Sequence, residues 1–179
     1  MKKIYILLMH TKTIPSKIVK IFTGYKYSHV AISLDKSCEV TYSFGRRKLN
    51  SILNGGFNIL HKDGEFFKKF NKTKCKIYEV DVTEEQYKKV EEIIEDMIKE
   101  QEKYKYDFIG IIPRLFGVPI TIENRYVCSY FVAEVLEKAN ILKFNKPTCL
   151  VRPKDFENIK GFKEVYEGKY VSQQRNNWI

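Results

Sequence analysis

Residues 126–136 read YVCSYFVAEVL and place a cysteine, Cys128, where an apolar helix is expected to begin. A cysteine in such a helix is most often a small buried apolar side chain. At a helix N-terminus, however, the field of the aligned peptide dipoles stabilises a thiolate and makes the side chain more reactive. The rest of the sequence decides between these two roles, because a catalytic thiol needs partners.

The composition is that of a globular protein. The chain has 179 residues, of which 44% are hydrophobic, and we expect one domain over residues 1–179 with a frayed tail from about residue 168. The 32 Lys and Arg exceed the 22 Asp and Glu, giving a net charge of +10. Such a charge favours an anionic surface or membrane as a contact. Because the basic residues are dispersed and no basic block alternates with aromatic residues, a nucleic-acid partner is not expected.

The first ten residues, MKKIYILLMH, contain an apolar run of about five residues, which is too short for a signal peptide and predicts a buried strand. No run approaches the ~18 apolar residues of a membrane span, so a cytoplasmic protein is expected. The four cysteines are widely spaced and favour neither a zinc site nor a disulfide framework. No metal or cofactor is expected.

Local patterns predict a mixture of helices and strands. Alternating apolar residues on both sides of Asp35-Lys36-Ser37 predict a β-hairpin, and Thr83 with Gln86 forms the capping box of a long helix. The other expected elements are a short helix in 11–24, an irregular stretch over 46–73, a strand at 75–82, the Cys128 helix to about 139, a short helix starting at Pro153 and a strand near 162–171. The long helix is expected to bury Tyr87, Val90, Ile94, Met97 and Ile98.

A nucleophilic cysteine needs a base, which is usually histidine. His10 ends the first strand and His61 lies in a Gly- and Lys-rich loop, whereas His29 opens the first strand of the predicted hairpin. If only the Val30 and Ile32 face is covered, His29 points to a polar layer or cleft. If both faces are covered, His29 is buried and must find partners.

A catalytic histidine also needs a group that orients its ring. The next strand offers Glu39, Thr41 and Ser43. If Leu34 pairs with Cys38, Ser43 lies across from His29, while Glu39 is the only carboxylate of the three. Geometry therefore favours Ser43 and chemistry favours Glu39, and the sequence leaves the choice open.

Two motifs carry a family resemblance: YSHVAISLD, with a histidine opening a hairpin, and far downstream YVCSYFVAEVLEKANI. Together they resemble the circularly permuted papain-like (NlpC-like) cysteine hydrolases, in particular the YaeF/YiiX-like group, over roughly residues 4–167. The lecithin retinol acyltransferase family is a more distant permuted relative. The permuted order is that of this chain, in which the histidine precedes the cysteine.

The resemblance implies an α+β, papain-like core in which the nucleophile-bearing helix packs against an antiparallel sheet. It implies Cys128 as nucleophile and His29 as general base, with Glu39 or Ser43 at the family's third catalytic position. Many relatives have His or Glu there, and the match in this chain is unclear. Aromatic side chains, among them Tyr25, Tyr27 and Tyr106, are candidates for the wall of a substrate cleft.

The expected reaction is thiol-dependent cleavage of an amide in a small amide, a peptide or a muropeptide, as in relatives that cut bacterial peptidoglycan. The alternatives are a thiol acyltransferase or lipase that acts on lipid esters, and a non-catalytic basic binding module in which Cys128 is structural.

Overall fold

In a computed structural model of the chain, residues 1–10, 25–47 and 54–170 are described. The helix expected within residues 11–24 lies outside these ranges. The described strands are β1 (Lys2–His10), β2 (His29–Ser33), β3 (Val40–Arg46), β4 (Gly55–His61), β5 (Lys74–Val82), β6 (Lys105–Tyr106), β7 (Arg125–Tyr126) and β8 (Phe162–Lys169). The described α-helices are α2 (Glu65–Lys69), α3 (Glu84–Lys99), α4 (Ile111–Leu115) and α5 (Cys128–Lys138). Short 3₁₀ turns cover Gln101–Lys103, Thr148–Leu150 and Pro153–Phe156.

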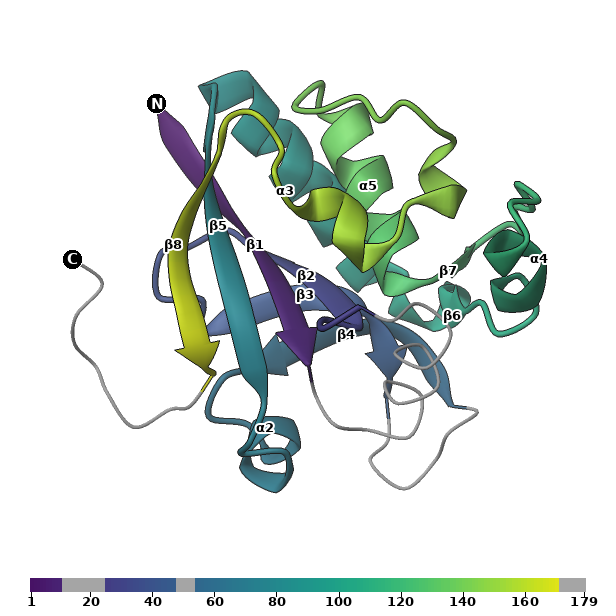
Figure 1. The fold of residues 1–179 in the computed structure, drawn as a ribbon, viewed down its shortest axis with the longest axis horizontal. Coiled ribbons are helices and arrows are strands. Elements are labelled where there is room, and N and C mark those ends of the chain that lie inside the picture. Colours follow the sequence, from purple (N-terminus) through teal and green to yellow (C-terminus); the bar gives the residue numbers. More distant parts are fainter. Residues whose placement is uncertain (11–24, 48–53, 171–179) are drawn as a thin grey trace.

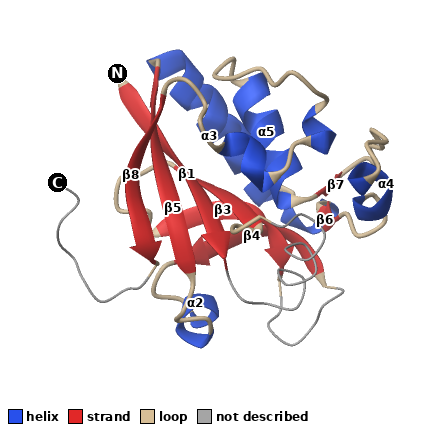
Figure 2. Ribbon diagram, viewed as in Figure 1, coloured by secondary structure: helices blue, strands red, loops and turns tan. Residues whose placement is uncertain are grey.

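The described strands form one curled sheet in the order β7-β6-β4-β3-β2-β1-β5-β8 (Figure 1). Neighbouring strands are antiparallel except β6 and β7, which are parallel. Helices α3 and α5 lie together on one side of the sheet, while α2 lies apart from them, near the start of β5 (Figure 2). The predicted α+β class is therefore confirmed.

Both faces of the central strands are covered, as β1 shows. Its residues Ile4, Ile6 and Leu8 belong to the larger core, between the sheet and helices α3 and α5. The residues between them, Tyr5, Leu7 and Met9, belong to a second core that includes Phe67 of α2 and Tyr170. Side chains alternate between the two faces of a strand, so a strand covered on both faces reads as the continuous apolar run seen in the sequence.

Residues 46–73 are not irregular, as the sequence suggested, because they contain β4 and α2. The sequence Asn54-Gly55-Gly56 is of the kind that favours a turn, but both glycines lie in a strand that other chain segments approach closely. A Cβ atom at Gly55 would stand 2.7 Å from Tyr106 Cβ, and one at Gly56 would stand 2.4 Å from the Tyr104 carbonyl oxygen. The glycines therefore serve close packing, not a change of chain direction.

The other predicted elements are present with small differences. Thr83 and Gln86 form the expected capping box of α3, but Ile98 on that helix is 38% exposed and is not part of the buried stripe. The helix predicted at Pro153 is a 3₁₀ turn. Strand β8 continues to Lys169, and Tyr170 is buried against Phe67, so the chain is ordered up to residue 170; the rest of the tail expected to fray lies outside the described ranges.

No helix in the described ranges is long and apolar enough to cross a membrane.

Candidate active site

Cys128 is the first residue of α5, directly after the extended N-cap residue Val127. No side chain caps this helix, so its first N–H groups are free to face the cysteine. The backbone N–H groups of Val30, Ser129 and Cys128 itself point to the thiol and act to lower its pKa, but burial outweighs them and the pKa of Cys128 is raised. The residue is 6% exposed. The resting thiol is therefore protonated at neutral pH.

The hydrogen bond from Val30 places the sulfur beside the residue that follows His29. Helix α5 packs on β2 and β3 from the side of the larger core. Its N-terminus lies where β2 begins, and the amide that reaches Sγ belongs to the peptide bond between His29 and Val30. The structure thus places Cys128 beside the backbone of Val30, the residue that follows His29, although the two lie about a hundred positions apart in the chain.

Between β2 and β3, side chains replace some of the backbone hydrogen bonds that normally join neighbouring strands. These strands pair at Ile32 and Tyr42. Two residues before Ile32, the carbonyl of Val30 accepts a hydrogen bond from Ser43 Oγ at 2.5 Å, and the N–H of Val30 points to the Cys128 thiol. The peptide groups of Val30 therefore tie β3 and α5 together at the site.

His29 stands at the start of β2, opposite Met9 of β1. Directly paired residues of antiparallel strands point to the same face of the sheet, and Met9 belongs to the second core. The His29 side chain therefore leaves the backbone on the face of the sheet opposite to α5. Burial lowers the pKa of His29 to about 4, so the ring is neutral at pH 7. Within the described ranges, no hydrogen bond joins the ring to the Cys128 thiol.

The pairing of β2 with β3 corrects the expected position of the third residue. With Ile32 opposite Tyr42, Gly45 comes opposite His29, two positions beyond the expected partner Ser43. Ser43 instead faces Ala31 and binds the Val30 carbonyl. This hydrogen bond makes Ser43 a group that positions the Val30 peptide.

Glu39 and Thr41 do not lie beside His29 either. Glu39 is exposed, and its carbonyl accepts a hydrogen bond from the Lys62 amide at the opposite end of β3. Six residues of strand separate it from Gly45, which corresponds to about 20 Å. Thr41 donates to the Leu60 carbonyl at 3.3 Å. The expectation that Glu39 orients His29 therefore fails, because the hairpin directs it to the far end of the strand.

Asn58 is a polar residue of the site that the sequence reasoning missed. A Cβ atom at Gly45 would stand 3.7 Å from His29 Cε1 and 3.4 Å from Asn58 Nδ2, so only a glycine separates the two side chains. Asn58 is 7% exposed and donates through Nδ2 to the Arg46 carbonyl at 2.7 Å. A buried asparagine between Phe57 and Ile59 was the available signal in the sequence, since buried polar groups need a reason.

Tyr106 lies on the Cys128 side of the site. Burial and, after it, the charge that Cys128 would carry as a thiolate raise the pKa of the Tyr106 hydroxyl, so the two groups are close and the phenol stays protonated. The next residue, Asp107, is fully buried and accepts hydrogen bonds from the Gly110 amide at 2.9 Å and from Arg114 Nη2 at 2.6 Å. This ion pair fixes the segment that carries Tyr106.

Tyr25 and Tyr27 lie in a different environment from Tyr106. Tyr27 is 1% exposed and donates its hydroxyl to Glu167 Oε1 of β8 at 2.9 Å. Tyr25 packs edge-on against Tyr27, with ring centroids 6.0 Å apart. Burial and then a hydrogen bond with Glu157 raise the pKa of Tyr25. These contacts give both rings a packing role next to β8.

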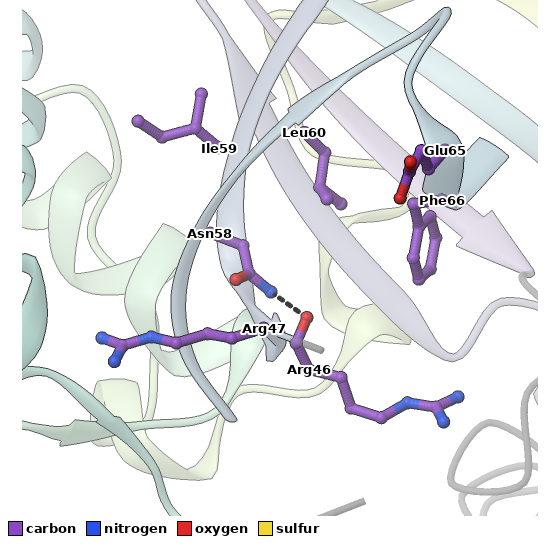
Figure 3. Close-up of a pocket in the computed structure, with 7 residues that line it drawn as sticks. All are labelled: Arg46, Arg47, Asn58, Ile59, Leu60, Glu65 and Phe66. Carbon is purple, nitrogen blue, oxygen red and sulfur yellow. Dashed lines mark hydrogen bonds between the residues drawn. The ribbon is translucent and has the colours of Figure 1, made fainter. Parts of the chain in front are cut away.

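A pocket of about 200 Å³ opens beside Asn58 and Arg46 (Figure 3). Asn58 and the side chains of Leu60 and Phe66 line it together with Arg46, whose guanidinium points away from Asn58. The full lining is Arg46, Arg47, Asn58, Ile59, Leu60, Glu65 and Phe66. The pocket offers apolar and cationic surface on the His29 side of the sheet.

In the described ranges, no three His, Cys, Asp or Glu side chains are grouped closely enough to hold a metal ion. All four cysteines are free thiols and all are buried. Burial raises the pKa of both Cys38 and Cys75 to about 12, and neither begins a helix. Cys128 differs from these two in having backbone N–H donors directed at its sulfur.

A scan against protein-family models and a search of curated proteins found no match for this chain.

Proposed function

We propose that this protein is a cysteine hydrolase that cleaves an amide bond, with Cys128 as nucleophile and His29 as general base. The observation that carries the proposal is the position of the Cys128 sulfur at the start of α5, where it accepts a hydrogen bond from the amide that follows His29. The papain-like, circularly permuted arrangement is part of the proposal. Helix α5 on a largely antiparallel sheet, with the histidine strand earlier in the chain, supports it.

The charge states of His29 and Cys128 before substrate binds define the first step of the proposed reaction. A neutral imidazole and a protonated thiol are the resting forms, since burial disfavours both charges. His29 therefore takes the thiol proton as sulfur attacks the carbonyl carbon, so the ion pair does not exist before substrate binds. Catalytic hydrogen bonds are often formed only in the substrate complex, which fits a ring and a thiol that do not yet touch.

The remaining steps use the same two groups. The negative charge that develops on the carbonyl oxygen is stabilised by N–H groups at the start of α5. The imidazolium gives its proton to the leaving amine as the C–N bond breaks, which leaves a thioester on Cys128. Water then attacks the thioester while His29 takes one of its protons, and the C–S bond breaks to regenerate the thiol.

The other residues of the site have supporting roles in this proposal. Asn58 is placed to orient the His29 ring across Gly45, which is the role proposed above for the third catalytic residue. Tyr106, as a phenol near the thiol, is placed to bind the substrate carbonyl or amide. The four free thiols suit a reducing compartment, and we include the cytoplasm in the proposal on that ground.

Trapping of the acyl-enzyme tests the proposal. Wild-type protein is mixed with p-nitrophenyl acetate, a set of short peptides and muropeptides, or phosphatidylcholine, then quenched in acid and analysed by intact mass and peptide mapping. An acyl group on Cys128 that is absent in His29→Ala, together with turnover of an amide, is the expected result. Cys38→Ala and Cys149→Ala are the matched controls and should acylate as the wild type does.

The outcomes separate the alternative functions. If Cys128 takes an acyl group from the phospholipid and no amide is turned over, the proposed function becomes that of an acyltransferase or lipase. If none of the compounds acylates Cys128, the result would favour a non-catalytic binding module in which this thiol has only a packing role.

A further inference from the structure

One segment of the molecule has its polar residues inside and its apolar residues outside. Residues 108–122 lie between Asp107 and Glu123 and contain a single charged residue, Arg114, which is 6% exposed. In the same segment Ile109 is 67% exposed, Ile112 65%, Phe116 82% and Val118 47%. The other large apolar side chains that are exposed in the described ranges are Met1 and Ile98, which lie outside this segment. We call residues 108–122 the apolar tip.

Buried hydrogen bonds enforce this reversal. Arg114 donates through Nη2 to Asp107 Oδ2 at 2.6 Å, and through Nε and Nη2 to the Ile120 carbonyl at 3.0 and 2.7 Å. The guanidinium thus holds the two ends of the tip, while the short helix α4 between them directs Ile112 and Phe116 outward. Exposure of these side chains is therefore built into the fold.

The tip projects from the body of the protein. Helix α4 lies beyond β6 and β7, at the edge of the molecule away from β8 (Figure 1). Gly117, with φ of +79°, makes the turn, and a Cβ atom there would meet nothing within 4 Å. Single exposed apolar residues are ordinary on protein surfaces, but four on one projecting segment indicate a contact surface.

Three cationic side chains lie near the base of the tip. Lys105 of β6 pairs with Arg125 of β7 in parallel register, so two positive side chains stand next to each other. Arg152 donates to the Leu115 carbonyl at the end of α4 at 3.2 Å, which holds a third cation there. Glu102, which is 3.9 Å from Lys105, is itself largely exposed. An apolar surface beside several cations is the pattern of proteins that bind the surface of anionic bilayers.

We propose that the apolar tip docks the protein onto an anionic lipid bilayer, with Ile109, Ile112, Phe116 and Val118 entering the headgroup region. Lys105, Arg125 and Arg152 then contact lipid phosphates. The net charge of +10 attracts the protein to the same surface. The proposal is independent of the chemistry at Cys128, because docking needs neither the thiol nor His29.

Vesicle sedimentation tests this inference. Full-length protein is mixed with vesicles of phosphatidylcholine alone or with ~30% phosphatidylglycerol, a mixture chosen to resemble the charge of natural anionic membranes. Wild type should bind the anionic vesicles more tightly and lose affinity in high salt. Phe116→Ser and, as a second variant, Ile112→Ser should each bind about tenfold more weakly, since each removes a large inserted side chain.

The controls separate docking from folding and from catalysis. Ile98→Ser removes an exposed apolar residue outside the tip and should bind as the wild type does. Cys128→Ala should also bind normally, so loss of the proposed hydrolase activity leaves this inference standing. Lys105→Gln combined with Arg125→Gln should reduce the preference for anionic vesicles.

Three results would overturn the proposal. One is absence of wild-type binding to the anionic vesicles, and another is equal binding by wild type and both tip variants. The third is lipid-independent self-association that Phe116→Ser abolishes, measured by sedimentation velocity without vesicles, combined with no vesicle binding. That third result would assign the tip to a second copy of this chain.

Discussion

Acid should destabilise this protein through one histidine. Burial lowers the pKa of His29 from 6.5 to about 4 in the folded state, while the unfolded chain keeps the ordinary value. Between these pH values the unfolded state binds a proton that the folded state does not. The stability contributed by neutral His29 is therefore complete above pH 6.5 and is lost as the pH falls through this window.

The size of the effect follows from the separation of the two pKa values. One pKa unit corresponds to about 1.4 kcal/mol, so the free energy of unfolding should fall by about 3 kcal/mol between pH 7 and pH 4 because of this residue. Carboxylates also change the stability in acid. For instance, hydrogen bonds from Lys26 and Tyr27 lower the pKa of Glu167 to about 2. These groups are the same in a His29→Gln variant, so the difference between the two proteins isolates the histidine.

Urea unfolding of wild type and His29→Gln at intervals from pH 7.5 to 4 measures the difference. Far-UV circular dichroism confirms that both remain folded at each pH. The gap between the two free energies should change by about 3 kcal/mol, with the wild type losing more stability in acid. A constant gap across this range would refute the assignment of His29 as a neutral ring whose pKa is lowered by desolvation.

Three substitutions test other parts of the site. Asp107→Asn leaves the guanidinium of Arg114 buried without its carboxylate and should cost about 3 kcal/mol or more in urea unfolding, with an unchanged value contradicting the buried ion pair. Gly56→Ala forces a Cβ atom against the Tyr104 carbonyl and should cost about 2 kcal/mol, whereas Gly45→Ala, whose nearest contacts are 3.4 Å or longer, should cost clearly less. Ser43→Ala removes a hydrogen bond to the Val30 carbonyl and should lower stability by about 1 kcal/mol, yet leave the pH dependence of acylation at Cys128 unaltered. A shifted pH profile in Ser43→Ala would instead show that this hydroxyl acts on His29.

The sequence predicted the elements that have strong local signals. The capping box at Thr83 and Gln86 located the start of α3, and the apolar run after Cys128 located α5. The motifs around His29 and Cys128 also selected two segments that meet in the fold, where the backbone of Val30 lies at the Cys128 thiol. Such patterns are readable because they depend on neighbours within a few positions.

The failures arose from contacts between distant segments. Gly55 and Gly56 imitate a turn, but Tyr104 and Tyr106, some fifty residues later, pack against them in the sheet. The hairpin register also differed by two residues, which moved Gly45 opposite His29 and brought Asn58 into the site. Register depends on the whole sheet, and neither the turn nor the alternation of one hairpin determines it.

The central claim is that His29 activates Cys128, and the pH dependence of alkylation at Cys128 tests it most directly. Iodoacetamide modification is followed by peptide mass spectrometry in wild type and His29→Ala. We expect wild-type Cys128 to react at neutral pH and to lose reactivity only as the pH approaches the His29 pKa of about 4. In His29→Ala the thiol should react only in alkaline solution, above its ordinary pKa of 9.0, because burial raises that value. Identical profiles for the two proteins would contradict the claim and leave Cys128 as a packing residue.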